Sequence, residues 1–152
     1  MDWDLPNAPK AFRGEGLVLR YRRILPGDLE LGFLPAYHYR IHLETGLEAG
    51  HINFRVGEEP RDNYVAGHIG FSVTPEFRGN RIAYRACKLI QPFVARVSGD
   101  VIITCDPDND ASRRTIELLG AKFLNERAVP EDDPAYALGS RRKLRYLWET
   151  GA

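Results

Sequence analysis

Two arginines around a glycine, in the run Arg78-Gly79-Asn80-Arg81, are the residues whose types and spacing most clearly indicate chemistry. An apolar stretch that closes at Thr74 and Pro75 precedes the run, and an apolar helical pattern begins directly after it. A helix N-terminus presents unpaired N–H groups and the positive end of the helix dipole, and the two guanidiniums add charge. The sequence therefore predicts an anion-binding turn at the start of a helix.

A strand is expected before this turn and a long helix after it. In residues 67–73, Ile69, Phe71 and Val73 alternate with small or polar residues, which indicates a strand with one buried face. The other face has room for something beside the strand, because it carries Ala66, His68, Gly70 and Ser72. A helix is predicted over residues 80–97, since apolar residues recur at three- or four-residue steps: Ile82, Ala86, Ile90, Phe93 and Val97. Pro92 is expected to kink it.

The rest of the chain reads mostly as strands. They are predicted at residues 17–24, 33–43 and 51–56 before the turn, and at residues 101–105, 121–129 and 143–148 after it. A second helix is expected to begin at Asp108 or Asn109 and to end near Leu119, before Gly120. This order predicts an α/β or α+β fold with a mixed sheet flanked by helices. Residues 1–16 are expected to form a loosely attached arm, and residues 17–149 a single domain.

Composition restricts the classes of partner and the location expected for this chain. The 152 residues carry 21 acidic and 21 basic side chains with no long run of either sign, which argues against nucleic acid or membrane as the main partner. No apolar stretch approaches the ~20 residues of a membrane span, and the N-terminus lacks the pattern of a signal peptide. Cys87 and Cys105 do not make a disulfide framework. A cytoplasmic location is expected.

Residues 78–83 resemble the acyl-CoA signature of the GNAT acetyltransferase superfamily. That signature is Arg or Gln, two residues, Gly, one residue, then Gly or Ala, and Arg81 stands where the family has its central glycine. A second block, residues 105–112 with residues 117–121, resembles the family's later motif, in which an asparagine begins a helix and a glycine ends it. The blocks lie about 30 residues apart, and the resemblance covers roughly residues 17–148.

The resemblance implies a GNAT-like mixed, mostly antiparallel sheet flanked by helices. It also implies direct transfer of acetyl from acetyl-CoA to the amine of a small molecule or peptide in a ternary complex, without a metal. Backbone groups of the central strand would pair with the pantetheine arm of acetyl-CoA, and a backbone N–H there would stabilise the oxyanion. The residues expected to bind acetyl-CoA are Phe71, Val73, Arg78, Gly79, Asn80, Arg81, Ile82, Ala83, Asn109 and Ser112.

The sequence indicates a candidate for the catalytic base more clearly than one for the acid. By resemblance His68 occupies the position where some relatives carry a catalytic Glu, and we take it as the base, with Glu76 as a second candidate. The family's usual acid, a Tyr seven residues after the helix-starting asparagine, is replaced here by Ile116. The acid therefore stays open between solvent and the hydroxyls of Ser112, Tyr84 and Tyr146, and Ser112 has an alternative role in capping the helix.

The sequence leaves two alternatives to an acetyltransferase. A non-catalytic acyl-CoA-binding or sensing domain is the main alternative, since both the tyrosine and the central glycine are missing. A nucleotide-binding protein is disfavoured because the chain has neither a Gly-x-Gly-x-x-Gly run nor the Lys-Ser/Thr of a phosphate loop. His38, His42 and His51 lack the spacing of a metal site. The resemblance also implies a possible homodimer, and loops at residues 25–39 and 130–140 are expected to shape the acceptor site.

Overall fold

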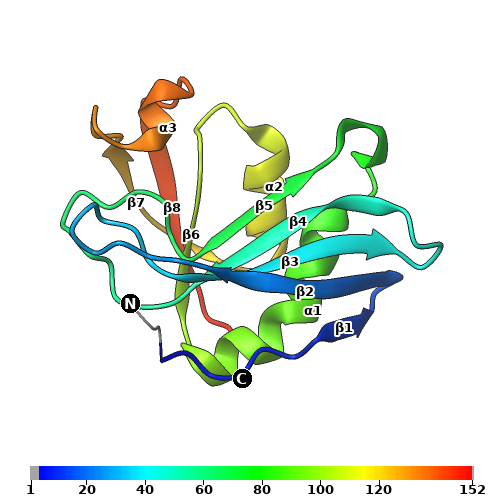
Figure 1. The fold of residues 1–152 in the computed structure, drawn as a ribbon. Helices are drawn as coiled ribbons and strands as arrows, with labels where there is room; N and C mark the ends of the chain where they lie inside the picture. The colour runs from blue at the N-terminus through cyan, green and yellow to red at the C-terminus, as the bar shows by residue number, and fades with distance from the viewer. Residues whose placement is uncertain (1–3, 152) are drawn as a thin grey trace.

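An eight-stranded sheet runs through the part of the chain that the structure, a computed structural model, describes (residues 4–151; Figure 1). Its spatial order is β1-β2-β3-β4-β5-β6-β8-β7, and all neighbouring strands are antiparallel except β5 and β6. The strands are β1 (Ala11–Gly14), β2 (Leu17–Leu25), β3 (Ala36–Leu43), β4 (Glu48–Arg55), β5 (Ile69–Val73), β6 (Val101–Cys105), β7 (Lys122–Ala128) and β8 (Arg142–Trp148). The predicted fold class, a mixed and mostly antiparallel sheet with helices, is confirmed.

The core lies between this sheet and the helix α1 (Ile82–Val97). The inner face of β3 carries Tyr37, Tyr39 and Ile41, which are fully buried. The ring of Phe93 on α1 lies 5.0 Å from the ring of Tyr37. Ile116 of the second helix, α2 (Asp110–Leu118), belongs to the same buried cluster, so both helices cover one face of the sheet. Pro92 lies on the exposed side of α1, and the helix continues through it.

The expectation of a loose N-terminal arm is wrong for residues 11–14. They form β1, which pairs antiparallel with β2. Phe12 packs its ring 5.4 Å from that of Tyr39 and 5.8 Å from that of Phe93, and the Tyr39 hydroxyl donates to the carbonyl of Pro9 at 2.7 Å. Four residues are too few for an alternation to be recognised, which is why the sequence does not indicate this strand. Met1–Trp3 lie outside the described residues.

Other boundaries shift by a few residues. The strand predicted from residue 33 begins at Ala36, because Phe33 is engaged in a separate bridge with Asp28. The strand predicted from residue 51 begins at Glu48, and β5 begins at Ile69, two residues later than expected. The predicted loop at residues 130–140 contains a short helix, α3 (Pro134–Ala137), whose N-cap is Asp133.

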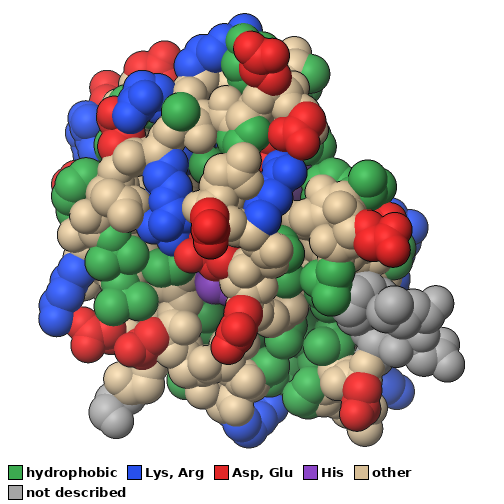
Figure 2. All heavy atoms as spheres, turned by 90° about the vertical axis from the view of Figure 1, so that its left-hand side faces the viewer, with side chains coloured by type: hydrophobic (Ala, Val, Ile, Leu, Met, Phe, Trp, Pro, Cys, Tyr) green, Lys and Arg blue, Asp and Glu red, His purple; other side chains and the backbone are tan. Residues whose placement is uncertain are grey.

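Acidic and basic side chains are interspersed on the side of the molecule that Figure 2 shows, around a hollow in which a histidine side chain is visible. Among residues 4–151, no helix is long and apolar enough to cross a membrane.

Replacing Phe12 tests whether β1 belongs to the core. Phe12→Ala should lower the free energy of unfolding by about 2 kcal/mol, less than a fully buried phenylalanine because the ring is only partly covered. Arg13→Ala is the matched control, since the neighbouring side chain is exposed on the same strand. Chemical denaturation of both variants checks this, and equal stability of the two would show that β1 does not pack on the core.

Candidate active site

The sheet splits between its only parallel pair, β5 and β6. The two strands share one register pair, Ile69 with Ile103. The side of β5 that faces the split follows from two hydrogen bonds to β4 at its ends: Arg55 N–H donates to His68 O, and Thr74 N–H to Ala49 O. The direction of the backbone N–H and C=O groups alternates along a strand. The backbone groups of the even-numbered residues of β5 therefore point toward β4, and those of Phe71 and Val73 point into the split. In the described part of the chain, no strand pairs with Phe71 or Val73 on that side.

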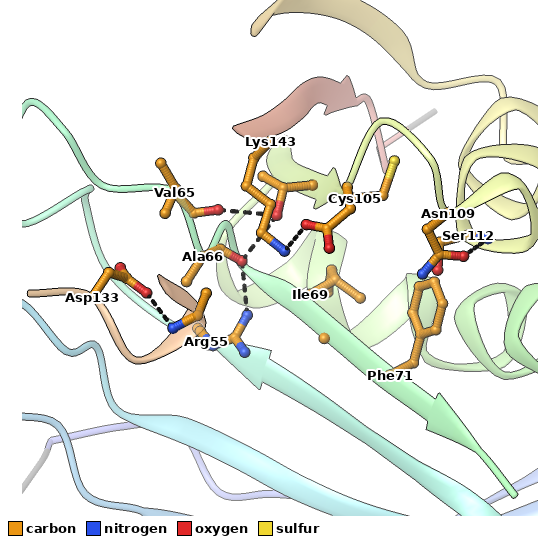
Figure 3. A pocket seen from close by; sticks show the side chains of 14 residues that line it. Arg55, Val65, Ala66, Ile69, Phe71, Cys105, Asn109, Ser112, Asp133 and Lys143 are labelled. Atoms are coloured by element: carbon orange, nitrogen blue, oxygen red, sulfur yellow. Dashed lines mark hydrogen bonds and ion pairs between the residues drawn. The ribbon is translucent and has the colours of Figure 1, made fainter. Parts of the chain in front are cut away.

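Two cavities open along this unpaired edge and share a wall. The larger, about 660 Å³, lies against the predicted turn and the start of α2. The smaller, about 280 Å³, lies at the other end of the edge and is drawn in Figure 3. Phe71, Asn109 and Ser112 line both cavities. The structure thus brings the predicted turn, the central strand and the start of the second helix together around one groove.

The turn is tight, and two of its residues lie in the left-handed region. A short 3-10 helix, η1 (Pro75–Phe77), follows β5, and the Arg78 guanidinium donates from Nε to Val73 O at 3.1 Å. Gly79 has φ 90° and Arg81 has φ 55°, both in the left-handed region. Most of the predicted turn residues line the larger cavity: Arg78, Gly79, Arg81, Ile82 and Ala83. Asn80 does not, and its side chain instead donates to Phe77 O.

The conformation of Arg81 shows why glycine suits this position of the signature. It is the N-cap of α1, and the left-handed conformation it adopts is one that glycine reaches without steric cost. A side chain at this position costs roughly 1–2 kcal/mol of backbone strain. The same substitution adds a second arginine, besides Arg78, to the lining of the larger cavity.

The start of α2 forms the other wall. Asn109 is its N-cap, as predicted, and its side-chain oxygen accepts from the Ser112 backbone N–H at 3.1 Å. The capping bond therefore uses the backbone of Ser112 and leaves its hydroxyl to the groove. Ile116, at the position of the family's tyrosine, is fully buried in the core. Tyr84 and Tyr146 line neither cavity, so of the three hydroxyl side chains proposed as the acid Ser112 alone lines the groove.

His68 is engaged elsewhere. Its Nδ1 accepts from the Ile102 backbone N–H at 3.0 Å, and its Nε2 lies 2.9 Å from Gly57 O, to which it donates. It lines neither cavity. Burial lowers the pKa of His68 and so favours the neutral ring, while the hydrogen bond to Gly57 partly opposes this effect. With Nδ1 accepting and Nε2 donating, the neutral ring has no free lone pair. These contacts give His68 a structural role and argue against its expected role as the base.

Four charged side chains line the smaller cavity, and of these only Asp133 lies in a segment, the loop at residues 130–140, that was expected to shape the acceptor site. The four are Arg55, Asp106, Asp133 and Lys143. Asp106 Oδ1 accepts from Lys143 Nζ at 2.7 Å and from Ser140 Oγ at 2.6 Å. Burial would raise the pKa of Asp106, but these hydrogen bonds outweigh it and the pKa lies below its usual value. The available signal was weak: Asp106 and Arg55 each stand at the end of an apolar strand pattern. Glu76, the second candidate base, is exposed on η1 and lines neither cavity.

The strain at Arg81 can be measured as stability. Arg81→Gly should leave the free energy of unfolding unchanged or raise it by up to about 1 kcal/mol, because relief of strain exceeds the entropy cost of glycine. Lys88→Gly, at an exposed position inside α1, is the control and should lose about 1 kcal/mol. Equal losses in the two variants, measured by denaturation, would contradict the left-handed conformation of Arg81.

His68 should leave a signature in the pH dependence of stability. Its folded-state pKa lies below the unfolded value of about 6.5, so the unfolded chain binds the proton first, and the contribution of His68 is lost as pH falls below that value. His68→Asn keeps an acceptor for Ile102 N–H but does not titrate, so its stability should fall less between pH 7 and pH 5. His51→Asn controls for the other histidine whose pKa burial lowers. An undiminished fall in His68→Asn would count against these contacts.

Comparisons with known proteins show the family and the fold of this chain. The family model described as the acetyltransferase (GNAT) domain matches residues 21–122, about two thirds of the chain. A GNAT-family acetyltransferase from Bacillus anthracis superposes with a TM-score of 0.66 at 14% identity, over 92% of this chain and 98% of that one. A ribosomal-protein-S5-alanine acetyltransferase from Vibrio fischeri gives 0.65 at 14%, over 90% and 94%.

A third structure, the microcin C7 self-immunity acetyltransferase in complex with acetyl-CoA and AMP, gives a TM-score of 0.55 at 19% identity, over 74% of this chain and 59% of that one. No protein of curated function matched the chain. At these identities the solved structures establish a shared fold, while the family model spans the strand, the turn and the second helix that build the groove. The chain belongs to the GNAT acetyltransferase family.

Proposed function

We propose that this chain is an acetyl-CoA-dependent N-acetyltransferase that passes an acetyl group directly to an amine. The observation that carries the proposal is the unpaired edge of β5, which leads from the turn to the smaller cavity. A donor bound along that edge and an acceptor in the smaller cavity would meet at Phe71 and Ser112, which line both cavities. Direct transfer in a ternary complex needs such a meeting point.

The residues of the larger cavity suit the donor. The diphosphate of acetyl-CoA would lie at the turn, where Arg78 and Arg81 supply charge and the first N–H groups of α1 supply donors. The pantetheine amides would pair with Phe71 and Val73 as an added strand in the split. Acetyl-CoA supplies the acetyl group as a thioester. The chain's part is to hold that carbonyl beside a backbone N–H of residues 71–73, which stabilises the oxyanion.

The transfer balances with few protein groups. The amine nitrogen adds its lone pair to the thioester carbon, and the carbonyl electrons move to oxygen. The carbonyl then re-forms, the C–S bond breaks, and sulfur leaves with the bonding pair as a thiolate. The nitrogen gives up one proton and the thiolate takes one up. Because both nitrogens of His68 are engaged, we infer that the amine reacts in its neutral form and that water accepts the proton the nitrogen gives up during transfer. The thiolate takes its proton from water while the Ser112 hydroxyl donates a hydrogen bond to it.

A non-catalytic acyl-CoA-binding domain remains the second candidate, favoured by two observations: Ile116 in the place of the tyrosine is buried, and His68 is engaged. Turnover separates the two functions. Release of free CoA with any amine, rising with pH in both the wild type and His68→Asn, supports an enzyme whose base is not His68. Loss of the rising limb in His68→Asn would restore His68 as the base. Binding of acetyl-CoA without turnover of any amine would favour the sensing domain.

The donor site is tested by calorimetric titration with acetyl-CoA, with CoA and ATP as controls. We expect a Kd on the order of 1 µM for the CoA compounds and much weaker binding of ATP, which has phosphates but no pantetheine. Gly79→Asp should weaken acetyl-CoA binding at least about tenfold relative to Gly79→Asn. The two variants share the strain of a side chain at φ 90° and differ by one negative charge. Equal affinities in the pair would remove the turn from the site.

A further inference from the structure

The smaller cavity contains one charged side chain without an ionic partner. Lys143 is paired with Asp106 at 2.7 Å. Asp133 lies 3.9 Å from Arg61 and caps α3 by accepting from Ala135 N–H at 2.9 Å. Arg55 donates from Nη1 to Ala66 O at 3.0 Å, and no carboxylate of the described residues lies within 4 Å of its guanidinium. Among the described residues, Arg55 is therefore the charged side chain of this cavity whose guanidinium has no carboxylate at ion-pair distance.

Arg55 is placed beside the point of transfer. It ends β4, and its guanidinium lies over Gly70 of β5, where an added Cβ would come within 2.8 Å of Nη2. Figure 3 shows the guanidinium directed toward the cavity, on the same strand pair as Ile69 and Phe71. Gly70 directly precedes Phe71. A group bound to Arg55 is thus only a few bonds from an amine that reaches Phe71, because one residue of a strand spans about 3.3 Å.

Holding this cation without an anion is unfavourable. Burial is the main effect on Arg55 and lowers its pKa, while nearby Tyr64 and Asp133 partly oppose it. The guanidinium stays charged at any physiological pH. A partly buried charge without an opposite charge costs free energy, which a bound anion recovers through paired, charge-assisted hydrogen bonds.

We propose that Arg55 binds an anionic group of the acceptor, so that the acceptor is a small amine that also carries a carboxylate or a phosphate. This inference rests on the proposed acetyltransferase function. The volume of about 280 Å³ is small for a ligand pocket and fits a molecule of amino-acid size. Gly70 serves this role by giving the guanidinium room against β5.

The test compares amines in matched pairs. Each of an α-, a β- and a γ-amino acid is offered beside its amide, and O-phosphoethanolamine beside ethanolamine, with kcat/KM corrected for the neutral amine fraction. The wild type should prefer the anionic member of at least one pair about tenfold or more, and which pair shows it separates carboxylate from phosphate. Arg55→Gln should abolish that preference and leave the KM for acetyl-CoA unchanged. Arg20→Gln, an equal loss of charge on an exposed part of β2, should change neither.

Binding gives a second readout that does not depend on turnover. Calorimetric titration of the same amines into the CoA complex should show tighter binding of the anionic member to the wild type than to Arg55→Gln. Should Arg55→Gln fail to fold, Gly70→Ala displaces the guanidinium without removing it and should also lower the preference. The proposal is overturned if neutral and anionic members react and bind alike, or if Arg55→Gln keeps the preference. Failure to bind acetyl-CoA overturns the proposed function instead, and the cavity's preference is then decided by titrating the free protein.

Discussion

The parting of β5 from β6 after a single register pair is the constraint on which the rest of the site depends. A sheet normally pairs both edges of an inner strand, because unmade backbone hydrogen bonds are costly. Here Phe71 and Val73 face the split instead. The missing partner defines the groove, which continues into a cavity at each end. An unpaired edge inside a sheet is a place where an extended, amide-bearing ligand can add itself as a strand.

Contacts at the closed end of the split hold it in this shape. His68 binds both backbone groups of Ile102: the backbone N–H of His68 donates to Ile102 O, and its ring Nδ1 accepts from the Ile102 N–H. The segment before β5 is anchored further by Arg145, only 3% exposed, whose guanidinium bonds Glu59 at 2.6 Å. Because Arg145 is buried and Glu59 only partly exposed, removing Glu59 would leave a buried charge without this partner. The strands are therefore fastened at one end and open at the other, which makes His68 part of the frame of the site.

Much of this arrangement could be predicted from the sequence. The apolar patterns of the sequence located both longer helices and every strand of the described residues except β1, since these patterns depend on which faces are buried. The turn around Gly79 and the cap at Asn109 were predicted because their local residue types determine their conformation. His68 was predicted as the base and Arg55 was given no role, because the contacts of both side chains depend on partners far along the chain. His68 meets Ile102 across the split, and Arg55 meets Gly70 only through the register of β4 with β5.

We propose that acetyl-CoA binds along the open edge of β5, and amide hydrogen exchange at that edge reports this binding residue by residue. Exchange at Phe71 and Val73 would be measured with and without saturating acetyl-CoA, beside Ile52 of β4, a core residue outside both cavities. We expect acetyl-CoA to slow exchange at Phe71 and Val73 by at least about tenfold while exchange at Ile52 is unaffected. Unchanged exchange at Phe71 and Val73 in the saturated protein would mean that the donor binds elsewhere.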